Sequence, residues 1–329
     1  MADSLRVTVD DLARMRGQLL FDGPEARTKL SRFWALLALA TVIAAAGVVG
    51  DSTATVIGAM IVAPLMTPIL GSVLSIATGD GKNLARSLAL VAAGAAAVVA
   101  IGYLVGLLVP YEVVASTNSQ VASRIHPRLI DLLAALATGA VGSFALVRSD
   151  ISDTLPGVAI AISLVPPLAV AGLTLESGAP HQSAGAVLLF LTNVAAILLS
   201  GLIVMALYRV GRTPGSANAR MRHRRLSIAL VVFFTLVIAI PLGAASRSLT
   251  DETRDASKVE KVAVRWAKPA GWHVDQVDPS STRVVVHASG PLPAPKTSLL
   301  RAQLDAAGLR SLAVRVELVP EYTVDLNGN

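Results

Sequence analysis

Pro64 and Pro68 stand four residues apart in the middle of an apolar stretch that runs from Asp51 to Gly71. Proline has no backbone N–H, and its ring crowds the carbonyl group of the residue four positions earlier, so an unbroken helix is not expected here. The carbonyl groups that lose their helical partners lie near Met60 and Pro64. In a bilayer, such groups are tolerated only inside protein or beside water. The spacing therefore predicts a broken membrane helix, for which a simple proline kink is the alternative.

A second stretch of the same kind begins 99 residues later, at Asp150. Apolar residues match easily by chance, whereas matches of polar residues, glycine and proline are more informative. The informative pairs are Asp51 with Asp150, Thr55 with Thr154, Gly58 with Gly157 and Pro68 with Pro167. We interpret the two stretches as halves of a diverged internal repeat, with Asp51 and Asp150 at equivalent starting points.

The two stretches and the helix after the second one offer backbone carbonyl groups, helix ends, hydroxyl groups and one amide. The predicted binding residues are Pro64, Thr67, Pro68, Ser163, Pro166, Pro167 and Asn193. The repeat pairs Thr67 with Pro166 and Pro64 with Ser163, so the two halves offer related but unequal groups. The amide of Asn193 cannot satisfy all its hydrogen bonds within one helix, so it needs a neighbouring helix or a substrate.

Other hydroxyl groups at membrane depth are expected to bond to the backbone of their own helix. They belong to Ser72, Ser75, Thr192 and Ser200. No Asp, Glu, Lys, Arg or His lies at the centre of an apolar segment, so a proton-coupling carboxylate is not predicted.

The composition places most of the chain in a bilayer. Hydrophobic residues make up 53% of the chain and charged residues 15%, and the mean hydropathy is +0.64. Such values are typical of a membrane protein with a polar remainder. The absence of cysteine excludes disulfide bonds and thiolate metal sites. No metal or other cofactor is predicted.

Seven apolar segments are long enough to cross a bilayer. They are Phe33–Gly50, Thr53–Thr78, Leu84–Val109, Leu129–Val147, Leu155–Leu175, Ala184–Tyr208 and Leu226–Ala245. Each repeat holds three segments, an odd number, so the second repeat must be inverted relative to the first. The predicted fold is an α-helical polytopic membrane protein with a 3+3 inverted repeat, whose proline-broken second and fifth spans meet near the midplane.

Lys and Arg residues are distributed unevenly between the two predicted sides of the membrane. The side that holds the N-terminus has Arg6, Arg14, Arg16, Arg27, Lys29, Arg32, Lys82, Arg86, Arg148, Arg209, Arg212, Arg220, Arg222, Arg224 and Arg225. The short loops of the other side have Arg124 and Arg128. Basic loops stay in the cytoplasm, so we expect a cytoplasmic N-terminus. The net charge of +6 then marks topology, with anionic lipid rather than nucleic acid as the expected partner of Arg220–Arg225.

The spans divide the chain into five predicted parts. They are a cytoplasmic N-terminal segment (1–32), an inverted-repeat membrane domain (33–208), a basic cytoplasmic loop (209–225), a seventh membrane helix (226–245) and an extracytoplasmic α+β domain (246–329). In the first part, Thr8 and Asp11 resemble a capping box that opens a short helix, Asp10–Leu20.

The last part has the pattern of a small αββαβ module. Its expected elements are a helix with Val259, Val262 and Trp266 on one face, strands at Trp272–Val277 and Thr282–Ala288, a helix at Pro295–Ala307, and a strand in which Leu312, Val314, Val316 and Leu318 alternate with other residues. His273 and His287 are predicted to be solvated strand positions rather than metal ligands, because no carboxylate cluster accompanies them.

Two motifs resemble the signature of a prokaryotic membrane family, the "uncharacterised hydrophobic domain" group (domain of unknown function 389). The first runs from Asp51 to Ile69, and the second comprises Leu155–Ala161, Leu164–Leu168 and Phe190–Asn193. The resemblance covers about Phe21 to Tyr208. Thr67 stands where the family pattern has a glycine. The resemblance implies a bacterial or archaeal inner-membrane protein and supplies no activity or substrate.

Catalytic patterns are missing from the sequence. It has no serine, histidine and carboxylate set at membrane depth, no His-Glu-x-x-His and no phosphate-binding glycine loop. We therefore predict a non-enzymatic transporter or channel for an ion or small solute, with its site at the broken helices. The alternative is a membrane-anchored sensor or scaffold whose outer domain binds a ligand or partner. A homo-oligomer is expected, because the membrane domain is small and the outer module marginal in size.

Overall fold

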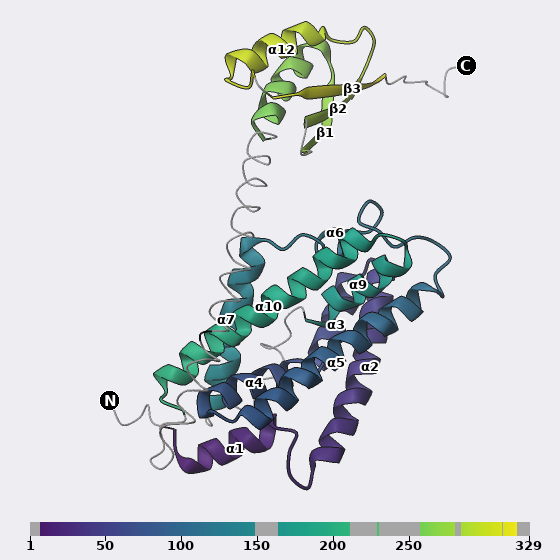
Figure 1. The fold of residues 1–329 in the computed structure, drawn as a ribbon. Coiled ribbons are helices and arrows are strands. Elements are labelled where there is room, and N and C mark those ends of the chain that lie inside the picture. The colour runs from purple at the N-terminus through teal and green to yellow at the C-terminus, as the bar shows by residue number, and fades with distance from the viewer. Residues whose placement is uncertain are drawn as a thin grey trace, which may run out of the picture. The chain divides into compact units, whose positions relative to one another are not determined.

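The computed structural model describes residues 7–148, 164–210, 229, 257–279, 284–310 and 312–320. The chain divides into an N-terminal unit, Met1–Leu242, and a C-terminal unit, Gly243–Asn329. Figure 1 shows that the first unit is built from helices and the second from helices and strands. Apart from residues 209, 210 and 229, the predicted basic loop and seventh span lie outside the described residues.

Four helices of the described part are long and apolar enough to cross a membrane, and a bent pair makes a fifth candidate. The described helices of the N-terminal unit are α1 (Val9–Leu19), α2 (Ala26–Val49), α3 (Thr53–Val62), α4 (Met66–Thr78), α5 (Gly81–Gly106), α6 (Ser119–Ala122), α7 (Leu129–Val147), α9 (Val165–Glu176) and α10 (Pro180–Leu207). The spans are α2, α5, α7 and α10, with α3 and α4 as the bent pair. Of the predicted fifth span, only residues from Leu164 onward are described.

Helix α1 begins with the predicted capping box. The Thr8 hydroxyl accepts a hydrogen bond from the Asp11 N–H at 3.1 Å, and the Asp11 carboxylate accepts one from the Thr8 N–H at 3.2 Å. Met15 and Leu19 are the buried residues of this helix. The polar N-terminal segment thus contains an amphipathic helix that packs on the rest of its unit.

Helices that the sequence repeat equates begin at equivalent residues. Helix α4 begins at Met66 and α9 begins at Val165, 99 residues later. Helices α5 and α10 also begin 99 residues apart, at Gly81 and Pro180. For these two pairs, the repeat that polar and proline matches indicated in the sequence also describes where the helices begin.

The ends of α4 and α9 share a backbone cap. Gly79 and Gly178 both adopt the left-handed conformation, with φ of 71° and 72°. The Gly79 N–H donates to the Ile76 carbonyl at 3.2 Å, and the Gly178 N–H donates to the Leu175 carbonyl at 3.3 Å. A side chain in this conformation costs roughly 1–2 kcal/mol, which explains why glycine stands at both positions.

Two close contacts between helices are related by the repeat: the residues of one contact are the repeat equivalents of the residues of the other. A β-carbon on Gly172 of α9 would lie 2.9 Å from the carbonyl carbon of Gly102 in α5. The residues equivalent to these two are Val73 of α4 and Gly201 of α10. A β-carbon on Gly201 would lie 3.1 Å from Val73 Cγ1. Each contact is matched by the contact between the equivalent residues, which is the pattern that a two-fold axis produces.

The equivalent helices α5 and α10 run in opposite directions, as Figure 1 shows. Val113, which follows the end of α5, donates its N–H to Ser177 Oγ at 2.9 Å. Ala115 donates its N–H to Gln182 Oε1, in the first turn of α10, at 3.0 Å. The end of one long helix therefore lies close to the beginning of the other.

The C-terminal unit contains mixed helices and strands in the order that the sequence predicts. A helix at residues 257–267 is followed by a 3₁₀ turn (Lys268–Ala270), β1 (His273–Pro279), β2 (Val284–Gly290), α12 (Thr297–Ala306) and β3 (Val314–Pro320). The sheet order is β1-β2-β3, with β1 antiparallel and β3 parallel to β2. These bounds differ by a few residues from the expected ones.

One face of this sheet is covered by both helices of the unit. Val286 of β2 is buried in a cluster with Trp266 of the first helix and with Leu300 and Leu304 of α12. Leu299 of α12 is 56% exposed, because it lies on the opposite side of the helix from this core. The alternation predicted for the last strand is present, with Val314, Val316 and Leu318 packed against the cluster.

The two histidines of the unit lie on strands β1 and β2, His273 exposed and His287 half-buried. His287 Nδ1 lies 3.4 Å from Glu317 Oε2 on the neighbouring strand. Within the described ranges, no group of three or more His, Asp or Glu residues could hold a metal ion.

Candidate functional site

The second span is interrupted between Val62 and Met66. Helix α3 ends at Val62, Ala63 has the extended angles φ −68° and ψ 126°, and α4 begins at Met66. The two helices are bent by 46° at this break. The sequence predicted an interruption, and the structure places it at residues 63–65.

The break leaves carbonyl groups without helical partners. The last carbonyls of any helix lack an N–H donor from the next turn, and here Pro64 cannot supply one to Met60. Among the described residues, no backbone N–H donates to the carbonyl groups of residues 60–63. The Pro64 carbonyl instead accepts from the Thr67 N–H at 3.1 Å. The break therefore presents a row of hydrogen-bond acceptors.

The other prolines stand in the first turns of the two half-helices. Pro68 is the third residue of α4, and Pro166 and Pro167 are the second and third residues of α9. The first N–H groups of a helix have no partner within it, so proline is well tolerated there. These prolines also remove free N–H donors, which leaves both helix starts poor in hydrogen-bond donors.

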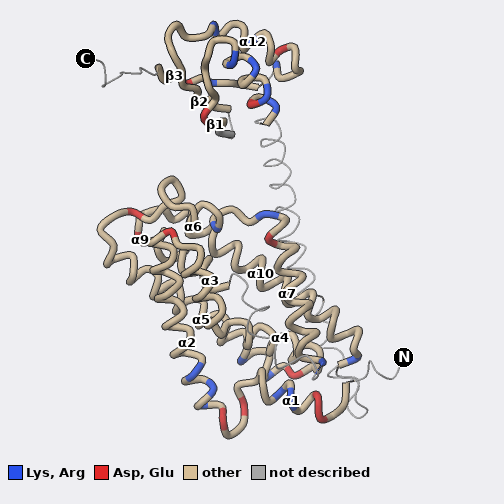
Figure 2. Tube along the Cα trace, turned by 180° about the vertical axis from the view of Figure 1, so that it is seen from behind, with Lys and Arg blue, Asp and Glu red and all other residues tan. Residues whose placement is uncertain are grey.

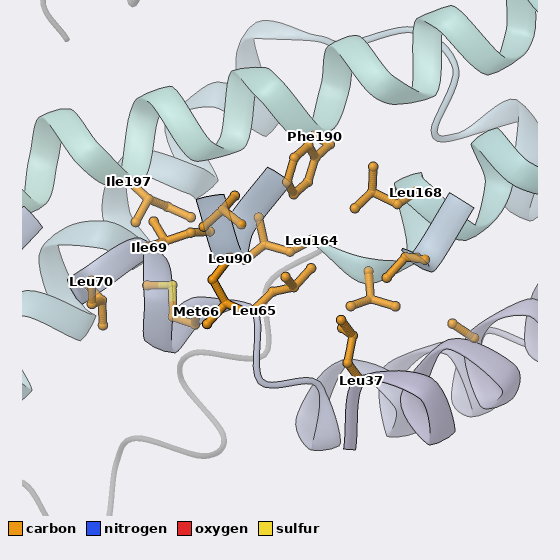
Figure 3. Packing of buried hydrophobic residues seen from close by; sticks show 14 of the residues in the cluster. Leu37, Leu65, Met66, Ile69, Leu70, Leu90, Leu164, Leu168, Phe190 and Ile197 are labelled. Carbon is orange, nitrogen blue, oxygen red and sulfur yellow. The ribbon is translucent and has the colours of Figure 1, made fainter. Parts of the chain in front are cut away.

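The two half-helices form the enclosed centre of the N-terminal unit. Residues 68–77 of α4 and 165–174 of α9 are all buried, whereas α5 exposes many of its side chains. Figure 3 shows Leu65 and Met66 at the start of α4 in one cluster with Leu164 and Leu168 at the start of α9. The beginnings of the two half-helices thus lie in a common core.

Asn193 is 3% exposed and lies in the middle of α10. The repeat equates it with Gly94 of α5. A β-carbon on Gly94 would lie 3.0 Å from Leu65 Cδ2, directly at the first break. The asparagine amide therefore occupies the repeat position that faces a break in the first half.

The remaining predicted residues are dispersed or undescribed. Ser163 and Asp150 lie outside the described residues. Asp51 is exposed at the far end of α3 from the break, where its carboxylate accepts from Ser119 Oγ at 2.8 Å and the Gln120 N–H at 3.0 Å. The structure thus brings Pro64, Thr67 and Pro68 together at one break and leaves Asp51 apart from them.

Most buried hydroxyl groups bond to their own helix, as expected. Ser72 donates to the Pro68 carbonyl at 2.9 Å, Thr192 to that of Leu188 at 2.8 Å, and Ser200 to that of Ala196 at 2.9 Å.

Two buried hydroxyl groups differ. Ser75 Oγ and Ser143 Oγ have no hydrogen-bond partner in the part of the chain that the structure describes. Ser143 was not expected, since its repeat equivalent is Ala44 and no spacing in the sequence marks it.

Comparisons with known proteins match the part of the chain that holds the break. Residues 60–199 match the family described as "Domain of unknown function (DUF389)". The chain is also 36% identical over 206 residues to the uncharacterized protein MJ0678 of Methanocaldococcus jannaschii. That match covers 62% of this chain and 62% of the relative, so it spans less than two thirds of the relative's length. No solved structure matches the chain.

Replacing both Pro64 and Pro68 by alanine is expected to extend the helical ladder across the break. The new N–H groups could donate to the carbonyls of residues 60 and 64, and proline in a helix interior costs about 3 kcal/mol relative to alanine. Deuterium uptake of the peptide that spans residues 61–67 should then slow by about tenfold. Hydrogen-exchange mass spectrometry of the protein in lipid nanodiscs measures this.

Pro180→Ala is the matched control, because Pro180 is the first residue of α10, where an N–H has no helical partner. Its uptake at residues 61–67 should stay at the native rate. Unchanged uptake in the double variant would mean that packing, rather than proline, holds the break open.

Proposed function

The chain is a member of the DUF389 domain family, and from this premise we propose that it is a membrane transport protein, a channel or a carrier, that passes an ion or a small solute through the broken second span. The observation that carries the proposal is the break at residues 63–65, inside a unit of membrane-length helices, with carbonyl groups that no backbone N–H of the described residues pairs. The proposed role is not enzymatic.

The physical reason is the high cost of unpaired backbone at membrane depth. An unsatisfied carbonyl in hydrocarbon costs several kcal/mol, so irregular backbone persists where it lines a cavity or is buried in protein. Discontinuous helices supply ion and substrate ligands in many transporters. The carbonyl groups of residues 60–63 are suited to this role.

The chemistry of the break favours particular substrates. Carbonyl oxygens accept hydrogen bonds and bind cations but cannot donate. The prolines of both helix starts also reduce the number of N–H donors that could hold an anion. No carboxylate lies in residues 60–68 to replace the water shell of a strongly hydrated divalent cation. The proposed substrate is a weakly hydrated cation or a neutral solute that carries hydrogen-bond donors.

The finer architecture that we propose is a 3+3 inverted repeat followed by a seventh span. The matching helix starts, the shared glycine caps and the exchanged Gly102–Gly172 and Val73–Gly201 contacts support a two-fold relation between the halves. The opposite directions of α5 and α10 support inversion. In such a fold the second break would stand opposite the first, near Asn193.

Basic residues support a topology with the N-terminus in the cytoplasm. Figure 2 shows Lys and Arg residues around α1 and the nearby helix ends. Contacts between distant parts of the sequence define this end, since Arg16 contacts Asp80 and Arg14 donates to the Leu146 carbonyl. At the opposite end the described basic residues are Arg124 and Arg128. Asymmetry of this kind favours a cytoplasmic location for the α1 end.

The proposed topology predicts opposite locations for two reporter fusions. A reporter fused after Gly211 should be active in the cytoplasm, and one fused after Asn329 should be active outside it, because the seventh span would lie between them. Paired cytoplasmic and periplasmic reporters measure this. The same location for both would exclude either the seventh span or the proposed orientation.

The transport proposal predicts flux in proteoliposomes. A screen of monovalent cations and small neutral solutes should find one that crosses with the native chain and about tenfold more slowly with the Pro64→Ala, Pro68→Ala chain, because the latter closes the carbonyl row. Acceleration by substrate on the far side indicates a carrier, and its absence indicates a channel. Native protein that passes none of the solutes would favour the sensor or scaffold alternative.

A further inference from the structure

Helix α1 and the residues after it, which we call the inner cover (residues 9–22), are held at one end of the N-terminal unit by polar contacts. These are Arg16 Nη2 to Asp80 Oδ2 at 3.0 Å, Asn83 Nδ2 to Asp22 Oδ2 at 3.0 Å, and Arg86 Nη1 to the Phe21 carbonyl at 3.1 Å. The partner groups of these three contacts belong to the α4–α5 turn and the first turns of α5. A fourth contact, from Arg14 Nη2 to the Leu146 carbonyl at 3.0 Å, joins the cover to α7.

The inner cover lies directly on the second half of the broken span. A β-carbon on Gly71 of α4 would lie 3.2 Å from the Leu19 carbonyl oxygen and 3.0 Å from Ser87 Oγ of α5. Ser87 is 2% exposed. The contact between α4, α5 and the inner cover is therefore tight, and the cover packs directly over Gly71 and Ser87.

The attachment of the inner cover combines an apolar contact with partly exposed charges. Met15, Leu19, Leu20 and Phe21 are the buried apolar residues of the cover. The side chains of Arg16 and Asp80 are 42% and 23% exposed, so water reaches both ends of their ion pair. Gly23, with φ of 75°, turns the chain from the cover into α2.

Asp80 is ionised in this setting. Burial opposes its ionisation, but hydrogen bonds from Asn83 and the charge of Arg16 outweigh burial and hold the pKa of Asp80 below its usual value. The contact with Arg16 is therefore between full charges at neutral pH.

The second repeat has a cover at the corresponding place. Residues 107–128 precede α7 as the inner cover precedes α2, and Ala115 in this segment donates its N–H to Gln182 Oε1 at 3.0 Å. Gln182 is the repeat equivalent of Asn83. A side-chain amide at the same repeat position thus holds both covers, one with an ionic pair beside it and the other with neutral hydrogen bonds.

We infer that the inner cover is a gate, which swings away from α4 when the Arg16–Asp80 and Asn83–Asp22 contacts break and so opens the α1 end of the solute path. This inference rests on the proposed transport function. The ion pair is partly exposed, so hydration of both groups offsets part of the cost of separating them. The segment 107–128 forms the corresponding closure at the other end.

Thiol labelling tests the gate without any transported solute. The chain has no cysteine, so Ser87→Cys places a single thiol beneath the inner cover. Ser183→Cys is the control, because Ser183 is 8% exposed near the start of α10, at the opposite end. Both are combined with Arg16→Gln or Asn83→Ala in the full chain in lipid nanodiscs, and labelling by a water-soluble maleimide is timed.

Arg16→Gln or Asn83→Ala should speed labelling at position 87 by about tenfold, which is the effect of losing one charge-assisted hydrogen bond. Labelling at position 183 should keep its native rate in both variants. No acceleration at position 87 in either variant, or equal acceleration at both positions, would overturn the gate. Solute flux in proteoliposomes without faster labelling at position 87 would disprove the gate and leave the transport proposal standing. Faster labelling without flux removes the transport proposal and leaves a movable cover.

Discussion

A backbone carbonyl in hydrocarbon has no water to bind, and this constraint governs the N-terminal unit. Pro64 removes the donor that Met60 would have used, and the chain bends before α4 restores regular hydrogen bonding. Packing then encloses the half-helix that follows the break. Helices α4 and α9 are buried along almost their whole length, and longer helices supply the exposed surface. The broken span is the feature around which the other helices are arranged.

The repeat gives both halves a similar backbone and different chemistry. Equivalent helix starts, glycine caps and exchanged crossings preserve the geometry. The side chains at equivalent positions differ, with Gly94 in the first half and Asn193 in the second. The covers differ in the same way, because Asn83 is accompanied by an ion pair and Gln182 by neutral groups. Similar backbones can form a path through the unit, and unequal side chains can give its two ends different properties.

Local patterns in the sequence predicted much of the fold. The bounds predicted for α7, Leu129–Val147, are those of the structure, because apolar length and flanking charge decide them. Proline spacing indicated the interruption of the second span but not its location at residues 63–65, since Pro68 fits within the first turn of α4. The helix of the inner cover was predicted from its capping box, but the position of the cover against α4 and α5 was not. Its contacts join residues such as Arg16 and Asp80, which only the folded chain brings together.

The central claim is that the break adjoins a hydrated path at membrane depth. Two single-cysteine variants of the cysteine-free chain test it. Thr67→Cys places a thiol at the break, where Thr67 is partly buried, and Ile61→Cys places one on the outer surface of α3, where Ile61 is 48% exposed. A small water-soluble thiosulfonate reagent requires a thiolate, which forms in water and not in hydrocarbon. Reaction at position 67 about tenfold faster than at position 61 is the result expected for a hydrated break. Equal or slower reaction at position 67 would contradict the account.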